Sequence, residues 1–197
     1  MLARAIIAVG VVMALTGCGR GEPGPVRRIE VDPLPPYARP LEETPVKVVP
    51  LSEAAAAKLA DIRSVIDADS LSRLSRLADS EPGFISNFGG ASNRSHWDLL
   101  RRTGFDPLAR LGDLLDQPYG VLEVGDIDWY VWPDLAALPP EDLVPERLSF
   151  RDRARLQELV GETGIERIRA GAQYPGIRTA ISADGHWLYY VHETLDE

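Results

Sequence analysis

The chain carries the sequence IRTAISADGHWLYYVH at positions 177–192. Two runs rich in β-branched and aromatic residues flank a central Asp-Gly pair, which is a strong signal for a β-hairpin with a two-residue type I′ turn. Such a turn pairs Ile181 with Leu188. Because side chains alternate between the two faces of a strand, this pairing places Trp187 and Tyr189 on the same face of the hairpin.

A second hairpin is predicted upstream of the first. Two apolar runs, Gly120 to Val124 and Ile127 to Trp132, flank Gly125-Asp126, which suits a two-residue turn. Pro133 ends the second run because proline cannot continue a central strand. The sequence leaves open whether the two hairpins join in one sheet.

Helical patterns fill the region between position 51 and the hairpins, and also the segment that separates the hairpins. The expected signals at the helix starts are Ser52, Asp69, the Ser95 and Asp98 capping box, Asp106-Pro107 and, in the insertion, the Ser149 and Asp152 capping box. We therefore predict an α+β fold with N-terminal helices followed by two antiparallel β-hairpins separated by a helical insertion. The expected arrangement has two layers and about four strands.

The first eighteen residues have the features of an export signal. Arg4 precedes an apolar run from Ala5 to Leu15, which is too short to cross a bilayer because a spanning helix needs about 20 residues. The stretch Leu15-Thr16-Gly17-Cys18 resembles the lipobox of bacterial lipoproteins. The resemblance implies that residues 1–17 are a cleaved signal peptide. It also implies that Cys18 carries a diacylglycerol, usually with a further acyl group such as palmitate on the new amino terminus.

Eight prolines between Gly19 and Pro50 predict a semi-rigid spacer. We accordingly divide the chain into the signal peptide, a lipidated cysteine with a Pro-rich linker at 18–50, and a single globular domain at 51–197. Gly19 follows the cysteine, at a position where an aspartate favours retention of enteric lipoproteins in the inner membrane, and the absence of that aspartate resembles the outer-membrane default. The resemblance implies a lipid anchor in the bacterial cell envelope, in the outer membrane, with the domain facing the periplasm.

The acidic composition limits the classes of partner. The formal net charge is −9, which disfavours nucleic acid as a partner because a phosphate backbone repels such a surface. The lipid bilayer, through acylated Cys18, is the first expected partner, and an envelope protein, a peptide or a glycan is the second. No cofactor and no metal are expected, since no sequence pattern provides a set of ligands.

One candidate binding site is the polar loop that precedes the third helix. Two glycines in this loop allow a close approach of the backbone, and Asn87, Asn93 and Arg94 offer hydrogen-bond donors at a helix N-terminus. An anion or a peptide terminus is the expected ligand. The alternative is that the loop is only a flexible entry into the helix.

A second candidate site uses the aromatic residues of the hairpins, above all Trp129, Trp187 and Tyr189. If the hairpins share a sheet, these rings form a face that could bind an extended peptide or a glycan. The alternative is that the rings form the core beneath the helices.

The sequence favours a membrane-anchored envelope lipoprotein whose domain is a non-catalytic binding or structural module. No catalytic residue is assigned, because no nucleophile, acid/base pair or metal set stands out. The alternative is an envelope hydrolase, whose site would assemble His192, Asp98 or His96 only in three dimensions.

Replacing Cys18 with serine is expected to abolish labelling of the protein by a fatty-acid analogue, since serine lacks the thiol that accepts the lipid. The variant should accumulate as a precursor or as a soluble form. Gel analysis of cells grown with the labelled lipid measures both effects. Labelling that persists in Cys18→Ser would show that the lipobox interpretation is wrong.

Overall fold

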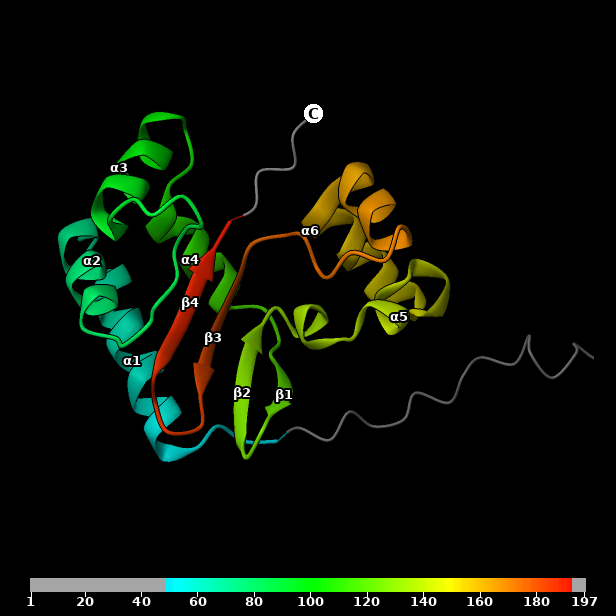
Figure 1. The fold of residues 1–197 in the computed structure, drawn as a ribbon, viewed down its shortest axis with the longest axis horizontal. Coiled ribbons are helices and arrows are strands. Elements are labelled where there is room, and N and C mark those ends of the chain that lie inside the picture. The colour runs from blue at the N-terminus through cyan, green and yellow to red at the C-terminus, as the bar shows by residue number, and fades with distance from the viewer. Residues whose placement is uncertain (1–48, 193–197) are drawn as a thin grey trace, which may run out of the picture. The chain divides into compact units, whose positions relative to one another are not determined.

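A computed structural model describes residues 49–192 of the chain (Figure 1). The chain divides into two units, Met1–Val46 and Lys47–Glu197. The predictions made for the signal peptide, Cys18 and most of the linker lie outside the described residues. Among the described residues, no helix is long and apolar enough to cross a membrane.

The predicted α+β fold is confirmed. Four helices come first, followed by two hairpins that are separated by a helical insertion. In chain order the elements are α1 (Glu53–Asp67), α2 (Leu71–Asp79), α3 (Asn93–Arg102), α4 (Pro107–Leu115), β1 (Gly120–Val124), β2 (Ile127–Trp132), η2 (Asp134–Ala137), α5 (Pro140–Leu143), η3 (Pro145–Arg147), α6 (Phe150–Arg169), β3 (Arg178–Ser182) and β4 (Trp187–Val191).

The four strands form one antiparallel sheet in the order β1-β2-β3-β4. The two hairpins are joined because β2 pairs with β3, with Trp129 opposite Ser182. The outer edge of β4 is covered by Ile85, whose N–H donates to the Leu188 carbonyl at 3.2 Å. The Ile85 carbonyl also accepts a hydrogen bond from the Tyr190 N–H at 3.0 Å. This segment therefore pairs with β4 as an additional strand would.

The turn between β1 and β2 is the predicted one, with Val124 opposite Ile127. The turn between β3 and β4 differs from the prediction. Ile181 pairs with Trp187 rather than with Leu188, because the register shifts after Ala180.

The backbone explains this difference. A type I′ turn needs a positive φ at both central residues. Among the described residues that are not glycine, only Asp69 has a positive φ, so Asp184 cannot occupy such a turn. The chain instead forms a three-residue loop in which Gly185 is left-handed and Ser182 donates its N–H to the His186 carbonyl at 2.9 Å. This loop displaces the pairing by one residue, and Leu188 lies at the resulting β-bulge.

The helix starts at Ser52, Asp106 and Ser149 are confirmed. Two predicted starts are wrong, one by a single residue and the other by three. Ser70, not Asp69, caps α2.

Ser92, not Ser95, caps α3. The hydroxyl oxygen of Ser92 accepts the Ser95 N–H at 3.2 Å, which places Ser95 inside the first turn of the helix. The two serines are three residues apart, so each could cap a helix on local grounds alone. The earlier one is used, and Asp98 then pairs with Arg94 at 2.8 Å.

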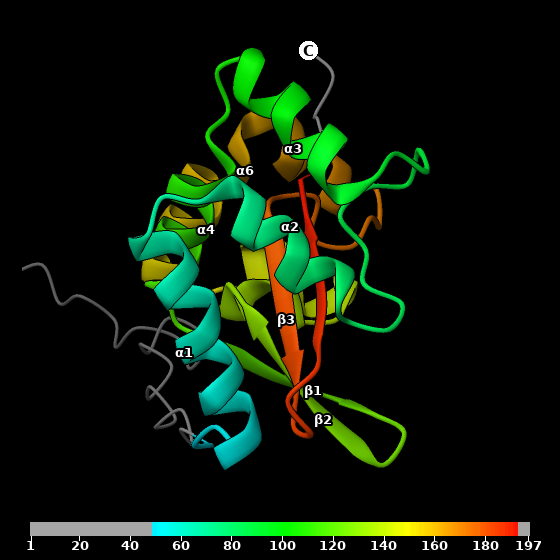
Figure 2. The same ribbon diagram turned by 90° about the vertical axis from the view of Figure 1, so that its left-hand side faces the viewer.

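Helices α1 to α4 cover one face of the sheet (Figure 2). Their apolar stripes and the inner face of the sheet form the main core, whose largest fully buried members include Trp97, Trp132 and Trp187. Buried tyrosines tie the layers together, since the Tyr190 hydroxyl donates to the Pro107 carbonyl at 2.9 Å. The insertion has a smaller core of its own, formed by Leu135, Leu143, Leu156, Val160, Ile165, Ile168 and Tyr174.

Gly120 allows the insertion to start close to the sheet. A Cβ atom at this position would lie 2.6 Å from the Ala137 Cβ and 2.9 Å from the Asp134 carbonyl oxygen. Both neighbours belong to η2, which packs against β1 and β2. Only glycine therefore fits here without displacing the backbone of η2.

Gly120→Ala is expected to lower the free energy of unfolding by about 1–3 kcal/mol, because the added methyl group overpacks a rigid contact. Urea denaturation measures the change. Gly112→Ala is the matched control. Its Cβ would meet only the Ile66 side chain at 3.6 Å, and alanine in a helix is favoured by about 1 kcal/mol over glycine. Equal effects of the two substitutions would contradict the role given to Gly120.

Candidate functional site

The face of the sheet that α1 to α4 leave uncovered is hollowed into a groove of about 620 Å³. Alternation along the strands explains its composition, because every second residue of each strand points to this face. The lining residues are Ile85, Phe88, Leu122, Trp129, Ala136, Ala137, Leu138, Pro139, Pro140, Gln173, Tyr174, Arg178, Tyr189 and Val191. The floor is therefore a sheet surface, one wall is formed by η2 and the residues that follow it, and the other is the segment around Ile85 and Phe88.

Each wall is fixed to the sheet by a specific contact. On one side η2 and the prolines that follow it lie close to β1, which Gly120 permits. On the other side the two backbone hydrogen bonds of Ile85 hold its segment along β4. The groove is thus formed by the fold itself, as is usual for ligand sites.

Exposed apolar side chains gather on this face. Among the described residues, the large hydrophobic side chains that are exposed are Ile85, Phe88, Leu99, Leu122, Val124, Ile127, Leu138 and Phe150. Four of them line the groove. Two more, Val124 and Ile127, alternate in register with Leu122 and Trp129 and so lie on the same face. Only Leu99 and Phe150 lie elsewhere, so the distribution is strongly one-sided.

A few polar groups accompany this apolar lining. Burial raises the pKa of the Tyr174 and Tyr189 hydroxyls, so both remain protonated at neutral pH and keep a hydrogen to donate. The Arg178 guanidinium donates to the carbonyl oxygens of Tyr174 at 3.0 Å and Gly176 at 3.3 Å. Behind the η2 wall, Arg155 pairs with Asp134 at 2.7 Å. The groove therefore combines apolar walls with a small number of fixed donors.

The structure separates the three aromatic candidates. Trp129 and Tyr189 line the groove. Trp187 does not, because the bulge at Leu188 turns its side chain toward the helices, where it is completely buried. Its indole N–H donates to the Thr179 hydroxyl at 2.8 Å. The expectation that Trp187 shares a face with Tyr189 is thus wrong.

Sequence reasoning missed several groove residues, notably Phe88, Tyr174 and Arg178. The alternation of β3 does place Arg178 on the outer face, so the sequence pattern was sufficient to predict this residue's position. Phe88 and Tyr174 come from loops, and no local pattern places a loop residue against a sheet face.

In the polar loop, the three candidate side chains bind other parts of the protein. The Asn87 amide donates to the Ala91 carbonyl at 2.9 Å and closes the loop on itself. Asn93 donates to the Asp79 carboxylate at 2.7 Å, which fixes the start of α3 to the end of α2. Arg94 pairs with Asp98 at 2.8 Å. These bonds give all three a structural role, and no described contact points to an anion.

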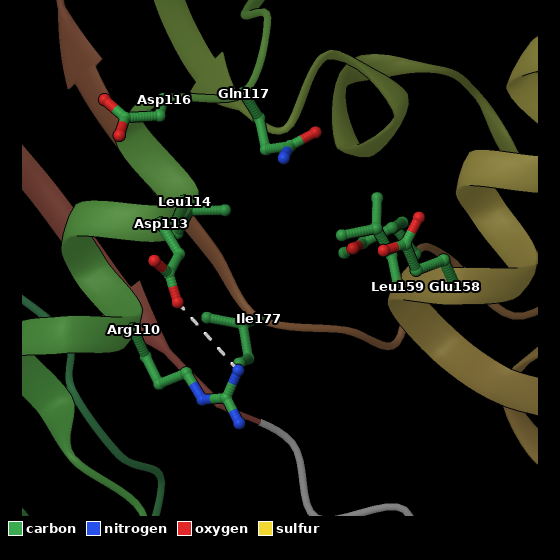
Figure 3. A pocket seen from close by; sticks show the side chains of 9 residues that line it. Arg110, Asp113, Leu114, Asp116, Gln117, Glu158, Leu159 and Ile177 are labelled. Carbon is green, nitrogen blue, oxygen red and sulfur yellow. Dashed lines mark ion pairs between the residues drawn. The ribbon is translucent and has the colours of Figure 1, made fainter.

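A second cavity of about 500 Å³ lies between α4 and α6 (Figure 3). Arg110 and Asp113 project from α4, and Glu158 and Leu159 from α6 on the opposite side. The acidic side chains there are partly neutralised, since Arg110 lies 4.0 Å from Asp113 and Asp116 pairs with Arg63 at 3.0 Å. This cleft has fewer exposed apolar groups than the groove.

The residues of the alternative hydrolase site are only partly brought together. His96 and His192 lie near enough for the charge of His96 to act on His192, and the His192 ring packs on Phe105 at 4.4 Å. Within residues 49–192, no hydrogen bond joins either histidine side chain to Asp98, which pairs with Arg94. Neither histidine lines the groove or the cleft.

The described residues include no group of three or more His, Cys, Asp or Glu side chains placed to hold a metal ion. The described residues therefore provide the alternative hydrolase site with no nucleophile–base pair and no metal centre.

Folding stability is expected to fall as the pH is lowered below about 6.5. Burial lowers the pKa of His96 and His192 below the ordinary value of 6.5, and nearby positive charge on His96 and Arg110 lowers that of His192 further. The unfolded chain therefore takes up protons first, which favours unfolding between pH 6.5 and the lowered pKa values. Urea unfolding at pH 7.5 and 5.5 measures this loss. His96→Gln combined with His192→Gln should reduce it, and an unchanged loss would contradict the assignment.

Comparison of the chain with protein-family models, curated proteins and solved structures found no match. What the groove can bind therefore follows from its own residues.

Proposed function

We propose that this protein is a non-catalytic binding module of the bacterial cell envelope, tethered to the membrane through acylated Cys18. Its site is the groove on the helix-free face of the sheet, and its ligand is an apolar segment of a polypeptide. The observation that carries the proposal is the gathering of exposed apolar side chains on that one face, with Phe88 exposed by 75%. Exposed apolar surface of this kind marks interaction sites in soluble domains.

The chemistry of the lining favours a polypeptide over a glycan. Sugar hydroxyls need several hydrogen-bond partners, and burying them without such partners is costly. Of the fourteen lining residues, only Gln173, Tyr174, Arg178, Tyr189 and, through its indole N–H, Trp129 carry polar side-chain atoms. Aliphatic and aromatic side chains of a partner would instead gain roughly 25 cal/mol for each Å² of apolar surface that leaves water.

The geometry also suits binding rather than catalysis. The two groove tyrosines stay protonated, and no described hydrogen bond links a groove side chain to a general base. The volume of about 620 Å³ falls in the usual range for ligand sites, roughly 300–1,000 Å³. A short peptide segment of a few side chains would fill it.

Photo-crosslinking in intact envelopes tests this function. A benzophenone amino acid at Phe88, in the groove, should give a discrete crosslinked polypeptide, because its ring lies where the partner packs. The matched control is the same amino acid at Phe150, which is exposed by 87% but lies away from the groove. Tyr189→Ala in the Phe88 probe should weaken the crosslink by about tenfold, since aromatic anchors often carry a large share of binding energy.

Crosslinks of equal yield at Phe88 and Phe150 would mean that the groove has no special affinity for a partner. If the Phe88 probe crosslinked only to lipopolysaccharide or glycan, the ligand would belong to one of those classes and not be a polypeptide. Either result would overturn the proposal.

A further inference from the structure

The outer edge of β1 is an open strand edge next to the groove. Val124 and Ile127 flank a two-residue turn, so they form a hydrogen-bonded pair, and so do Leu122 and its partner Trp129. The alternate residues of β1, Val121 and Glu123, consequently point their backbone N–H and C=O groups away from β2. Among residues 49–192, no hydrogen bond reaches these outward groups.

The two edges of the sheet differ in this respect. The edge of β4 is paired with the segment around Ile85. Among the described residues, no segment is hydrogen-bonded to the edge of β1, and its one charged side chain is Glu123. Its sequence, GVLEV, contains no lysine, no proline and no bulge. Figure 2 shows the β1–β2 hairpin extending beyond the helical layer.

The side chains of this hairpin differ between its two faces. On the groove face, Leu122, Val124 and Ile127 are exposed by 38–42%. On the other face Glu123 lies directly opposite Asp128, and neither has an ion-pair partner among the described residues. Two like charges in direct opposition destabilise a strand pair. A cationic side chain of a partner on this face would be attracted to both carboxylates.

We propose that β1 pairs with an extended strand of the partner polypeptide, in which apolar and basic side chains alternate. The apolar side chains would continue the row of Leu122 and Trp129 on the groove face. The basic side chains would lie beside Glu123 on the other face, with Asp128 one strand farther in. The strand's backbone would bond to the outward groups of Val121 and Glu123, as in other cases of strand addition. This inference rests on the proposed function, because it describes how the groove's ligand is seated.

A second copy of this chain fits the same edge less well. Antiparallel pairing of two β1 strands would bring Glu123 and Asp128 of both copies onto one face. Four carboxylates would then lie together without a counter-charge, which opposes association. The charge pattern thus selects a basic strand over self-association.

Binding of a labelled peptide of four Lys-Val repeats to the purified full-length protein tests the inference by fluorescence anisotropy. The peptide should bind, while a Glu-Val peptide of equal length should not. Affinity should fall as salt rises from about 50 to about 500 mM, because exposed charges are screened. Block-ordered Lys₄Val₄ is the control for alternation and should bind more weakly.

Two substitutions at one position separate backbone pairing from charge. Glu123→Gln keeps the outward N–H and removes the charge, and we expect about a threefold loss of affinity. Glu123→Pro also removes the N–H, and the loss should reach at least about tenfold. Proline is tolerated here because this N–H faces away from β2, and circular dichroism with thermal unfolding verifies the fold of both variants.

The groove variant Phe88→Ser distinguishes this inference from the proposed function. If Phe88→Ser weakens peptide binding but Glu123→Pro does not, the groove binds its ligand without strand addition and the inference is wrong. If only Glu123→Pro weakens binding, strand addition stands and the groove assignment is wrong. Sedimentation measures whether the protein dimerises. A dimer that Glu123→Pro converts to monomer would show that a second copy of the chain occupies the edge of β1, and the proposal of a basic strand would be wrong.

Discussion

The burial of Trp187 between the sheet and the helices is the contact on which the layered structure depends. Its indole donates to Thr179, and its ring lies 4.5 Å from Phe84 and 6.4 Å from Trp97. Removing a buried aromatic side chain typically costs about 3–5 kcal/mol, which is a large part of the stability of an ordinary domain. The contact exists only because the bulge at Leu188 turns Trp187 toward the helices. A local irregularity of the backbone therefore determines how the two layers join.

The same bulge divides the aromatic residues of the hairpins between two roles. Trp132, Trp187 and Tyr190 fill the core under the helices. Trp129 and Tyr189 remain on the opposite face, where only loops approach them. One sheet thus has a face that stabilises the fold and a face whose apolar surface stays exposed. The division is a consequence of alternation in the strands together with one displaced register.

Local signals predicted the elements of this fold well. Caps such as Ser52 and Ser149 and the Gly125-Asp126 turn act through neighbouring backbone groups, so the sequence alone specifies them. The cap of α3 and the register of β4 were harder to predict from the sequence, because each required a choice between two arrangements that local chemistry permits. The groove was predicted only through Trp129 and Tyr189. Its walls come from distant segments, and only tertiary packing brings these to the sheet.

Most of the chain obeys the rules that favour a single stable fold, and the departures from those rules lie close together. The uncovered apolar groove, the open edge of β1 and the opposition of Glu123 and Asp128 all occur at the β1–β2 hairpin and the face beside it. Each feature is unfavourable for an isolated domain, while helices α1 to α4 pack against most of the opposite face of the sheet. Natural proteins concentrate such departures where they bind or react. Their coincidence here supports the proposal that this hairpin, rather than the polar loop before α3 or the cleft between α4 and α6, is the surface that meets a partner.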